Sequence, residues 1–227
     1  MVIFDSVTKI FPNGDQVLDQ VGFHITAGEM VVITGKSGSG KTTIGRLLIG
    51  DLKPSEGQII VDGEKVIEAN LKELISLRRK IGTVFQDYKI IPDKTTYENV
   101  ALNLEVAGFD KEDIEKKVEK ILEMVGIPGK KDLFPSQLSG GELQRASLAR
   151  AIATEPHILF ADEPTGNLDK ATSKEIFELL KKINKAGTTV IIATHDEEFS
   201  SSGSIHHIHL DKGKIVKDSR PSKKKKK

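Results

Sequence analysis

Residues 35–43, Gly-Lys-Ser-Gly-Ser-Gly-Lys-Thr-Thr, constrain the fold of this chain more than any other stretch. They follow the apolar run 30–34, which predicts a buried strand, and they precede residues 44–49, which predict a helix. A strand, a glycine-rich turn and a helix in this order match the phosphate-binding pattern G-x-x-x-x-G-K-[ST]. A glycine- and serine-rich turn that only resembles the pattern is the alternative, and the flanking strand and helix argue against it. The chain is therefore expected to bind a nucleoside triphosphate.

Each residue type in this loop has a physical role in holding a phosphate. A loop that wraps an anion turns its backbone N–H groups inward through conformations that a Cβ obstructs, so glycines recur in it. The following helix adds the positive end of its dipole, and Lys41 supplies a charge for the β- and γ-phosphates. The Thr42 hydroxyl is placed to bind Mg²⁺, and Thr43 is expected to face the α-phosphate. The expected nucleotide-binding residues are Gly35, Ser37, Gly38, Ser39, Gly40, Lys41, Thr42 and Thr43.

The composition indicates a single folded domain with room for subdomains. The chain has 227 residues, of which 37% are apolar, enough to bury a core. It has no cysteine, which excludes disulfides, thiolate metal sites and thiol catalysis. Its apolar runs fall short of the roughly 18 residues that cross a bilayer, and its first residues lack the order of a secretory signal. By itself the chain is expected neither to span a membrane nor to be exported.

The net charge of +1 hides an asymmetry. Arg220 and a run of lysines that begins at Lys223 and ends at Lys227 hold six of the 34 positive charges, which leaves 28 against 33 acidic residues in residues 1–219. We expect residues 220–227 to form a basic, disordered tail that either solubilises the chain or anchors it to anionic lipid. The acidic body lacks the basic face of a duplex-binding protein, so no specific nucleic acid partner is expected.

Two pairs of short strands are predicted beside the phosphate-binding loop. Residues 2–11 and 17–25 alternate apolar and polar side chains on either side of a Pro-Asn-Gly turn, which indicates an antiparallel pair. Residues 58–61 and 64–67 give a second pair. Together they predict a small antiparallel sheet. Phe11 ends the first strand, where its ring either stacks on a nucleobase or faces the core.

Three further strands end in polar residues that suit phosphate chemistry. One ends at Gln86, one at Asp162 and Glu163, and one shortly before His195. The carboxyl ends of parallel strands meet at one edge of a sheet, where ligands bind. There Gln86 is expected to touch Mg²⁺ and a water, Asp162 to hold Mg²⁺, Glu163 to polarise the attacking water and His195 to contact the γ-phosphate. A solvated carboxylate pair and a structural histidine are the alternatives.

Helical spacing occupies most of the chain between Gln86 and Asp162, which predicts a helical insertion at about residues 88–155. Apolar side chains at the start of this insertion, from Tyr88 to Pro92, either bind a partner protein or pack into the core. The helices are expected over 71–80, 96–108, 112–125, 139–154 and 171–185.

A late strand at 204–210 carries three histidines. Alternation places His207 and His209 on one face of the strand and His206 on the other. The pattern predicts an ordinary strand, and a metal site is the alternative.

The stretch 138–145, Leu-Ser-Gly-Gly-Glu-Leu-Gln-Arg, indicates a second anion site. Ser139 followed by Glu142 three residues later is a capping box that opens a helix. Two glycines, Gly140 and Gly141, cost the first turn about 1 kcal/mol each relative to alanine, and they leave N–H groups that an anion can approach. The chain's own phosphate loop is already occupied on one side by its own helix. The second anion site is therefore expected to bind the γ-phosphate of an ATP that another subunit holds.

The phosphate loop, Gln86, the Leu-Ser-Gly-Gly motif, Asp162-Glu163 and His195 resemble, in this order and spacing, the nucleotide-binding domain of ABC ATPases. The resemblance covers about residues 1–218. It implies an α/β fold, an ABC-type P-loop ATPase domain over 1–219 with a mostly parallel core sheet, a flanking antiparallel β subdomain and a helical subdomain. It also implies hydrolysis of ATP with Mg²⁺ as cofactor.

By the same resemblance, two chains form a homodimer that sandwiches two ATP molecules head to tail, with Ser139, Gly140, Gly141 and Glu142 contacting the ATP of the partner subunit. Phe11 falls where the family has an adenine-stacking aromatic, more often a tyrosine. The family's dimer-contacting loop falls on Asn167, Leu168 and Asp169. The lysine tail is not part of the family pattern.

Within the family, residues 162–169 resemble the branch that serves lipoprotein release, macrolide export and cell division, and residues 77–87 and 96–101 are most similar to its cell-division members. That resemblance implies a peripheral subunit at the cytoplasmic face of the cell membrane, whose ATP-driven dimerisation moves an FtsX-like integral membrane permease. The ATPase of a lipoprotein-release or macrolide-type exporter is the alternative. A soluble DNA-associated ABC ATPase is a rival, but only about a hundred residues separate Lys41 from Ser139, too few for its coiled-coil or zinc-bearing insertion.

Overall fold

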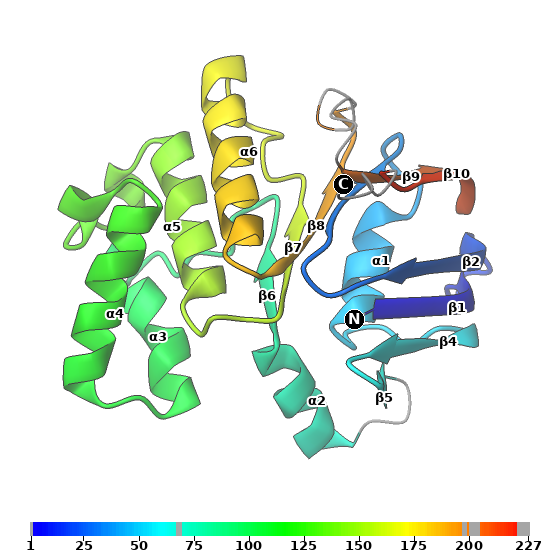
Figure 1. Ribbon diagram of the computed structural model, residues 1–227, viewed down its shortest axis with the longest axis horizontal. Helices are drawn as coiled ribbons and strands as arrows, with labels where there is room; N and C mark the ends of the chain where they lie inside the picture. The colour runs from blue at the N-terminus through cyan, green and yellow to red at the C-terminus, as the bar shows by residue number, and fades with distance from the viewer. Residues whose placement is uncertain (1, 67–69, 197–198, 200–204, 222–227) are drawn as a thin grey trace, which may run out of the picture.

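A mostly parallel sheet forms the centre of the molecule (Figure 1). The computed structural model describes residues 2–66, 70–196, 199 and 205–221. The strands of the central sheet are β3 (Met30–Thr34), β6 (Ile81–Val84), β7 (Ile158–Asp162), β8 (Thr189–Thr194), β9 (His206–Asp211) and β10 (Lys214–Ser219). Their order is β10-β9-β3-β8-β7-β6, with β10 antiparallel to β9 at one edge and the other pairs parallel.

A second, antiparallel sheet lies beside the central one (Figure 1). Its strands are β1 (Val2–Ile10), β2 (Gln16–Ile25), β4 (Glu56–Val61) and β5 (Glu64–Lys65), in the order β2-β1-β4-β5. Helix α1 (Lys41–Leu48) contacts β4 in this sheet and β7 and β8 in the central one. The flanking antiparallel subdomain predicted from the alternation of residues 2–25 is thereby confirmed.

The remaining helices are α2 (Leu71–Arg79), α3 (Thr96–Ala107), α4 (Lys111–Met124), α5 (Gly140–Ile152) and α6 (Lys170–Lys185). Helices α3, α4 and α5 pack on one another at the end of the molecule away from the antiparallel sheet, and α6 packs on α5 and β8 (Figure 1). Asn70, Thr95 and Ser139 each form a capping box with a glutamate three residues later, which fixes where α2, α3 and α5 begin.

The parallel strands are apolar throughout because helices or strands cover both faces of the central sheet. In β3, Val31 and Ile33 pack with α1 and the antiparallel sheet, whereas Met30 and Val32 pack with α3 to α6. Strands β7 and β8 divide their side chains between the same two cores. A run without alternation therefore identifies a strand that is buried on both faces.

The α/β fold class and the predicted helices and strands are confirmed to within a few residues, but β10 lies outside the predictions. It is an edge strand in which Val216 is 60% exposed, so the residues that face water weaken its apolar pattern. Lys212 (φ 47°) and Gly213 (φ 76°) form the tight turn that leads into it. The expected strand 64–67 ends at Lys65, and its last residue, 67, lies outside the described residues. For the apolar side chains from Tyr88 to Pro92, the sequence left two alternatives, partner binding and core packing. Ile90 packs against the helical core, which agrees with core packing.

The structure describes only the first two residues of the expected tail 220–227. Residues 222–227, which include the lysine run, lie outside the described residues. Arg220, assigned to the tail, donates to the backbone carbonyl of His24 on β2. Among the residues that the structure describes, no helix is long and apolar enough to cross a membrane.

Gly82 in β6 is predicted to be essential for the packing of α5 on the central sheet. A methyl group on Gly82 would overlap the backbone carbonyl of Ala151 and lie 3.0 Å from the Cγ of Pro156. Gly82→Ala should therefore lower the free energy of unfolding by about 2 kcal/mol. Gly129→Ala is the matched control, because a Cβ there meets nothing within 4 Å. Urea unfolding followed by circular dichroism measures both variants, and equal midpoints would contradict the packing argument.

Candidate nucleotide-binding site

Four strands of the central sheet end at one cavity of about 580 Å³. Strand β3 leads into the glycine-rich loop, β6 leads to Gln86, β7 to Glu163 and β8 to His195. The residues that line the cavity are Gly35, Lys36, Ser37, Gln86, Glu163, His195, His209 and Asp211. The structure thus brings together residues that the sequence predicted from four separate motifs.

The glycine-rich loop adopts a backbone that its glycines make possible. Gly38 (φ 79°) and Gly40 (φ 110°) lie in the left-handed region that residues with a Cβ rarely adopt. A Cβ on Gly35 would overlap the backbone carbonyl of Leu210. Ser39 is buried, so only its backbone is available to a ligand, whereas Ser37 and Thr42 are exposed.

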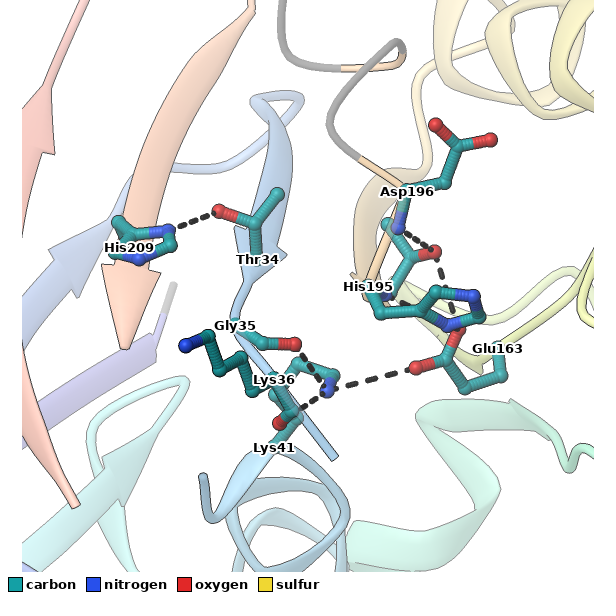
Figure 2. A network of polar contacts seen from close by, with 9 residues as sticks. Thr34, Gly35, Lys36, Lys41, Glu163, His195, Asp196 and His209 are labelled. Carbon is teal, nitrogen blue, oxygen red and sulfur yellow. Dashed lines mark hydrogen bonds and ion pairs between the residues drawn. The ribbon is translucent and has the colours of Figure 1, made fainter. Parts of the chain in front are cut away.

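Lys41, the first residue of α1, is surrounded by oxygen atoms. Its Nζ donates to the carbonyl of Gly35 at 2.8 Å and to that of Lys36 at 3.2 Å, and it lies 3.5 Å from Oε1 of Glu163 (Figure 2). The side chain is 6% exposed. A buried ammonium group without partners would be strongly destabilising, so these oxygens compensate its charge.

The Glu163 carboxylate connects Lys41 to the end of β8 (Figure 2). Its Oε2 accepts from the Thr194 hydroxyl at 3.1 Å and from the His195 backbone N–H at 3.2 Å, and it lies 2.9 Å from His195 Nδ1. Glu163 itself has a φ of 46°, and its N–H donates to the carbonyl of Ala193 at 2.7 Å. Such backbone strain in a residue other than glycine gathers at functional sites. The carboxylate is therefore fixed between a cation and an imidazole.

Asp162, the last residue of β7, has the properties of a metal ligand. Burial raises the pKa of its carboxyl group, the charge of Glu163 adds to the rise, and a hydrogen bond with Thr42 opposes it. Within the described part of the chain, its Oδ1 is buried and has no hydrogen-bond partner. A buried, unpaired carboxylate oxygen beside a threonine hydroxyl fits Mg²⁺, which binds oxygen and takes only one or two protein carboxylates at phosphate sites. Gln86, the third expected ligand, is exposed in the neighbouring cavity.

The capping box predicted at the start of α5 is confirmed. The Ser139 N–H donates to Oε2 of Glu142 at 2.9 Å, and the Glu142 N–H donates to the Ser139 hydroxyl at 3.4 Å. A Cβ on Gly141 would lie 2.8 Å from Cγ2 of Thr172 on α6, whereas one on Gly140 would make only ordinary contacts. Close packing with α6 is thus a reason for Gly141 that the sequence did not show. None of these four residues lines the cavity of the phosphate loop.

The loop assigned to dimer contacts precedes α6. Asp169 is the N-cap of α6, since its Oδ1 accepts from the N–H groups of Ala171 at 2.9 Å and Thr172 at 3.1 Å. Leu168 packs against the helical core, and Asn167 is exposed. The dimer contacts of this loop stay a prediction.

Phe11 lies in the turn after β1. Its N–H donates to the carbonyl of Asp15 at 2.9 Å, and Nζ of Lys9 lies 5.3 Å from its ring centre. The ring belongs to neither of the two hydrophobic cores of the described chain, so the core-facing alternative finds no support. Stacking on adenine stays a prediction.

His209 and Asp211, at the end of β9, line the cavity although sequence analysis did not place them there. Nε2 of His207 and Nδ1 of His209 lie 2.6 and 2.8 Å from Oγ1 of Thr34, the residue before the loop; Figure 2 shows the second contact. The pairing of β9 with β3 creates this proximity. The alternation in residues 204–210 was the available signal, but it could not name the neighbouring strand.

His206 lies on the opposite face of β9, as the alternation predicts. It is fully buried, with Nδ1 2.9 Å from Oε1 of Glu29 and Nε2 2.7 Å from Oδ1 of Asp218. Its two ring nitrogens thereby join β10 to the start of β3. Across the described residues, no cluster of three or more His, Cys, Asp or Glu has the arrangement of a metal site.

The known proteins that this chain resembles in sequence and in fold are ATP-binding proteins and cassettes. The family model described as ABC transporter matches residues 18–166. Two curated relatives are each named cell division ATP-binding protein FtsE. That of Bacillus subtilis (strain 168) is 43% identical over 218 residues and covers 96% of both chains. That of Escherichia coli (strain K12) is 43% identical over 215 residues and covers 95% of this chain and 97% of its own.

A solved structure of similar fold is the ATP-binding cassette MJ0796, described as a dimer in a post-hydrolysis state bound to ADP and Pi. It superposes with a TM-score of 0.89 at 37% sequence identity, covering 97% of this chain and 98% of that one.

The capping box at α5 is predicted to respond to acid. The N–H of Ser139, Lys130 and the Ser139 hydroxyl all bind the Glu142 carboxylate and lower its pKa to about 2. Because the ordinary value is about 4.3, the contribution of this carboxylate to stability is complete above that pH and is lost as the pH falls through about 2. The difference in thermal midpoint between the natural chain and Glu142→Gln should therefore shrink on acidification. Glu123→Gln, an exposed change on α4, should show no such trend.

Proposed function

The chain belongs to the ABC transporter family, and from this membership we propose that it is the ATP-hydrolysing subunit of a membrane ABC complex of the FtsE type, which serves cell division. The similarity of nearly the whole chain to proteins named FtsE supports the biological role. The observation that carries the biochemical role is the Glu163 carboxylate, which lies between Lys41 of the phosphate loop and His195.

Binding of the triphosphate exchanges the partners of Lys41. The ammonium group leaves the carbonyls of Gly35 and Lys36 for the β- and γ-phosphate oxygens, while the backbone N–H groups of the loop and the start of α1 bind the same anion. Its departure also frees Oε1 of Glu163. The carboxylate then becomes available to a water only once the phosphate has arrived.

Glu163 and His195 divide the remaining chemistry. Glu163 accepts a proton from the attacking water as general base. His195, oriented by the contact between its Nδ1 and Glu163, offers Nε2 to the γ-phosphate. Mg²⁺ bound by Thr42, Asp162 and Gln86 would neutralise charge on the β- and γ-phosphates. The unpaired Oδ1 of Asp162 supports that assignment.

A single chain holds only half of each complete site. Gly140 is exposed and Gly141 half-buried, and both lie outside the chain's own cavity, so a second copy must bring their amides to the γ-phosphate. ATP then contacts both chains, stabilises the closed pair, and releases it after hydrolysis. The similarity to cassettes that are described as dimeric supports the pairing of two chains.

The motion of the dimer is transmitted to a membrane partner. We place the chain on the cytoplasmic face of the cell membrane, as a peripheral subunit that pairs with an FtsX-like integral membrane permease. The full-length similarity to proteins of the FtsE type supports this pairing. The five terminal lysines add an electrostatic attraction to anionic lipid, worth about 1 kcal/mol for each residue near the surface.

Glu163→Gln is predicted to separate binding from hydrolysis. The amide keeps the shape of the side chain but accepts no proton, so turnover should fall by about 100-fold or more while ATP drives a stable dimer. Size-exclusion chromatography with ATP and Mg²⁺, together with phosphate release, measures both effects. Adding Lys41→Ala to this variant should abolish the dimer, since the phosphates lose their cation. Unchanged turnover in Glu163→Gln would exclude Glu163 as the base.

Permease binding and lipid binding are predicted to be separable. A chain that ends at residue 220 should still co-purify with a co-expressed FtsX-like permease from solubilised membranes. The same truncation should weaken binding to phosphatidylglycerol vesicles at low salt, because screening and loss of charge act on the same attraction. Unchanged vesicle binding would refute the lipid anchor, and failure of the full chain to capture the permease would refute the pairing.

A further inference from the structure

The segment that follows Gln86 has an unfavourable backbone conformation. Tyr88 has a φ of 60° and Lys89 a φ of 49°, two consecutive residues in the left-handed region. A side chain in this region brings Cβ too close to the next carbonyl, and non-glycine residues visit it singly. Local strain of this kind persists only where surrounding contacts impose it.

The contacts that impose it come from helix α5. The Arg150 guanidinium donates through NH1 to the carbonyl of Lys89 at 2.5 Å and through NH2 to the carbonyl of Tyr88 at 3.2 Å. The fully buried hydroxyl of Ser147 donates to the same Tyr88 carbonyl at 3.1 Å. Burial of Arg150 lowers the pKa of its guanidinium, which still carries its charge at neutral pH. Both ends of the strained pair are thus held by one helix.

The far end of the segment is also fixed. The Ile91 N–H donates to Oδ1 of the fully buried Asn99 at 2.9 Å, and Nδ2 of Asn99 donates to the carbonyl of Ile91 at 3.1 Å. The chain from Tyr88 to Ile91 therefore has little freedom to move independently of α3 and α5, and it begins two residues after the exposed Gln86.

Tyr88 also reaches the start of α5. Its hydroxyl lies 3.7 Å from the point where a Cβ on Gly140 would stand, and Leu168 lies 3.5 Å from the same point. The Tyr88 side chain therefore lies next to Gly140, close to where Leu168 of the loop before α6 approaches the same glycine.

We propose that Arg150 is a positioning residue for Gln86. By holding the carbonyls of Tyr88 and Lys89, it imposes the left-handed pair and so fixes where the chain leaves Gln86. Arg150 does not line the nucleotide cavity and acts through the backbone. The inference rests on the proposed function, because positioning matters only if Gln86 serves ATP hydrolysis.

A second arginine on α5 provides the comparison. Arg145 donates through NH1 to the carbonyl of Val125 at 2.7 Å and through NH2 to Glu175 at 2.7 Å. It ties α5 to its neighbours as Arg150 does, but its hydrogen bonds among the described residues go to Val125 and Glu175 and not to the segment that follows Gln86. Loss of Arg145 should therefore affect stability without the effect on positioning.

The first test is a double-mutant cycle on ATP hydrolysis by the full chain. Arg150→Gln should lower kcat by about tenfold and leave the affinity for ATP, measured by nucleotide fluorescence, within about twofold. If Arg150 acts through Gln86, the double variant Gln86→Ala, Arg150→Gln should be no slower than Gln86→Ala alone, within about twofold. Multiplication of the two losses would overturn the proposal.

The second test is rescue by glycine. Lys89→Gly removes the cost of the left-handed conformation, so in the Arg150→Gln background it should restore kcat by about threefold or more. Lys89→Ala loses the same ion pair, between Lys89 Nζ and Asp87 Oδ2 at 2.7 Å, without that freedom, and should restore nothing. Neither change should rescue Arg145→Gln. Equal rescue by alanine, or rescue of Arg145→Gln, would overturn the proposal.

The outcomes separate this inference from the proposed function. If the natural chain hydrolyses ATP and Glu163→Gln abolishes this activity, the proposed function is supported whatever the result for Arg150→Gln. If Arg150→Gln has the kcat of the natural chain, only the positioning role is refuted. If Arg150→Gln does not fold, Ser147→Ala takes its place in the cycle, because it removes one bond to the Tyr88 carbonyl with a small change in volume. Its loss of kcat should likewise vanish in the Gln86→Ala background, and an additive loss would overturn the proposal.

Discussion

The register of the parallel strands is the constraint on which the rest of this structure depends. Thr34 of β3 pairs with Thr194 of β8, and Asp162 of β7 pairs with Ala193 of β8, so the strands end level with one another. Because the side-chain period of a strand is two, a slip of one residue would turn every apolar side chain to the wrong core. The two hydrophobic cores that cover the sheet therefore also align the functional groups at its carboxyl edge.

At that edge, the charges of the protein compensate one another. Lys41 is buried and would be costly without an anion, and Glu163 beside Asp162 would suffer like-charge repulsion without a cation. The contact between Lys41 and Glu163 offsets both the burial of the Lys41 charge and the repulsion between the two carboxylates. In the proposed function, an incoming phosphate would compete for Lys41 with Glu163 and two carbonyl oxygens, so phosphate binding and the release of Glu163 Oε1 would be one event.

Sequence reasoning located the parts of the site that depend on local chemistry. The glycines of the loop, the residues that follow buried strands and the capping box at Ser139 are each fixed by their immediate neighbours in the chain. What it missed depends on long-range pairing. His209 and Asp211 reach the cavity only because β9 lies beside β3, and the edge strand β10 faces water along much of its length. The contact between Gly141 and Thr172 likewise needs the relative placement of two helices.

Helix α5 connects the segment that follows Gln86 with Gly140 and Gly141, two parts of the chain that the proposed function assigns to different ATP molecules. Its capping serine and Arg150 are eleven residues apart, about 16 Å along a helix that rises 1.5 Å per residue. Ser147 and Leu148 are fully buried, so the helix cannot turn about its axis without disrupting the core. The hydrogen bonds from Ser147 and Arg150 attach the backbone of Tyr88 and Lys89 to this same helix, whose first residue is Gly140. If Gln86 binds nucleotide as proposed, this helix links the occupied cavity to the surface that the proposal assigns to the partner's ATP.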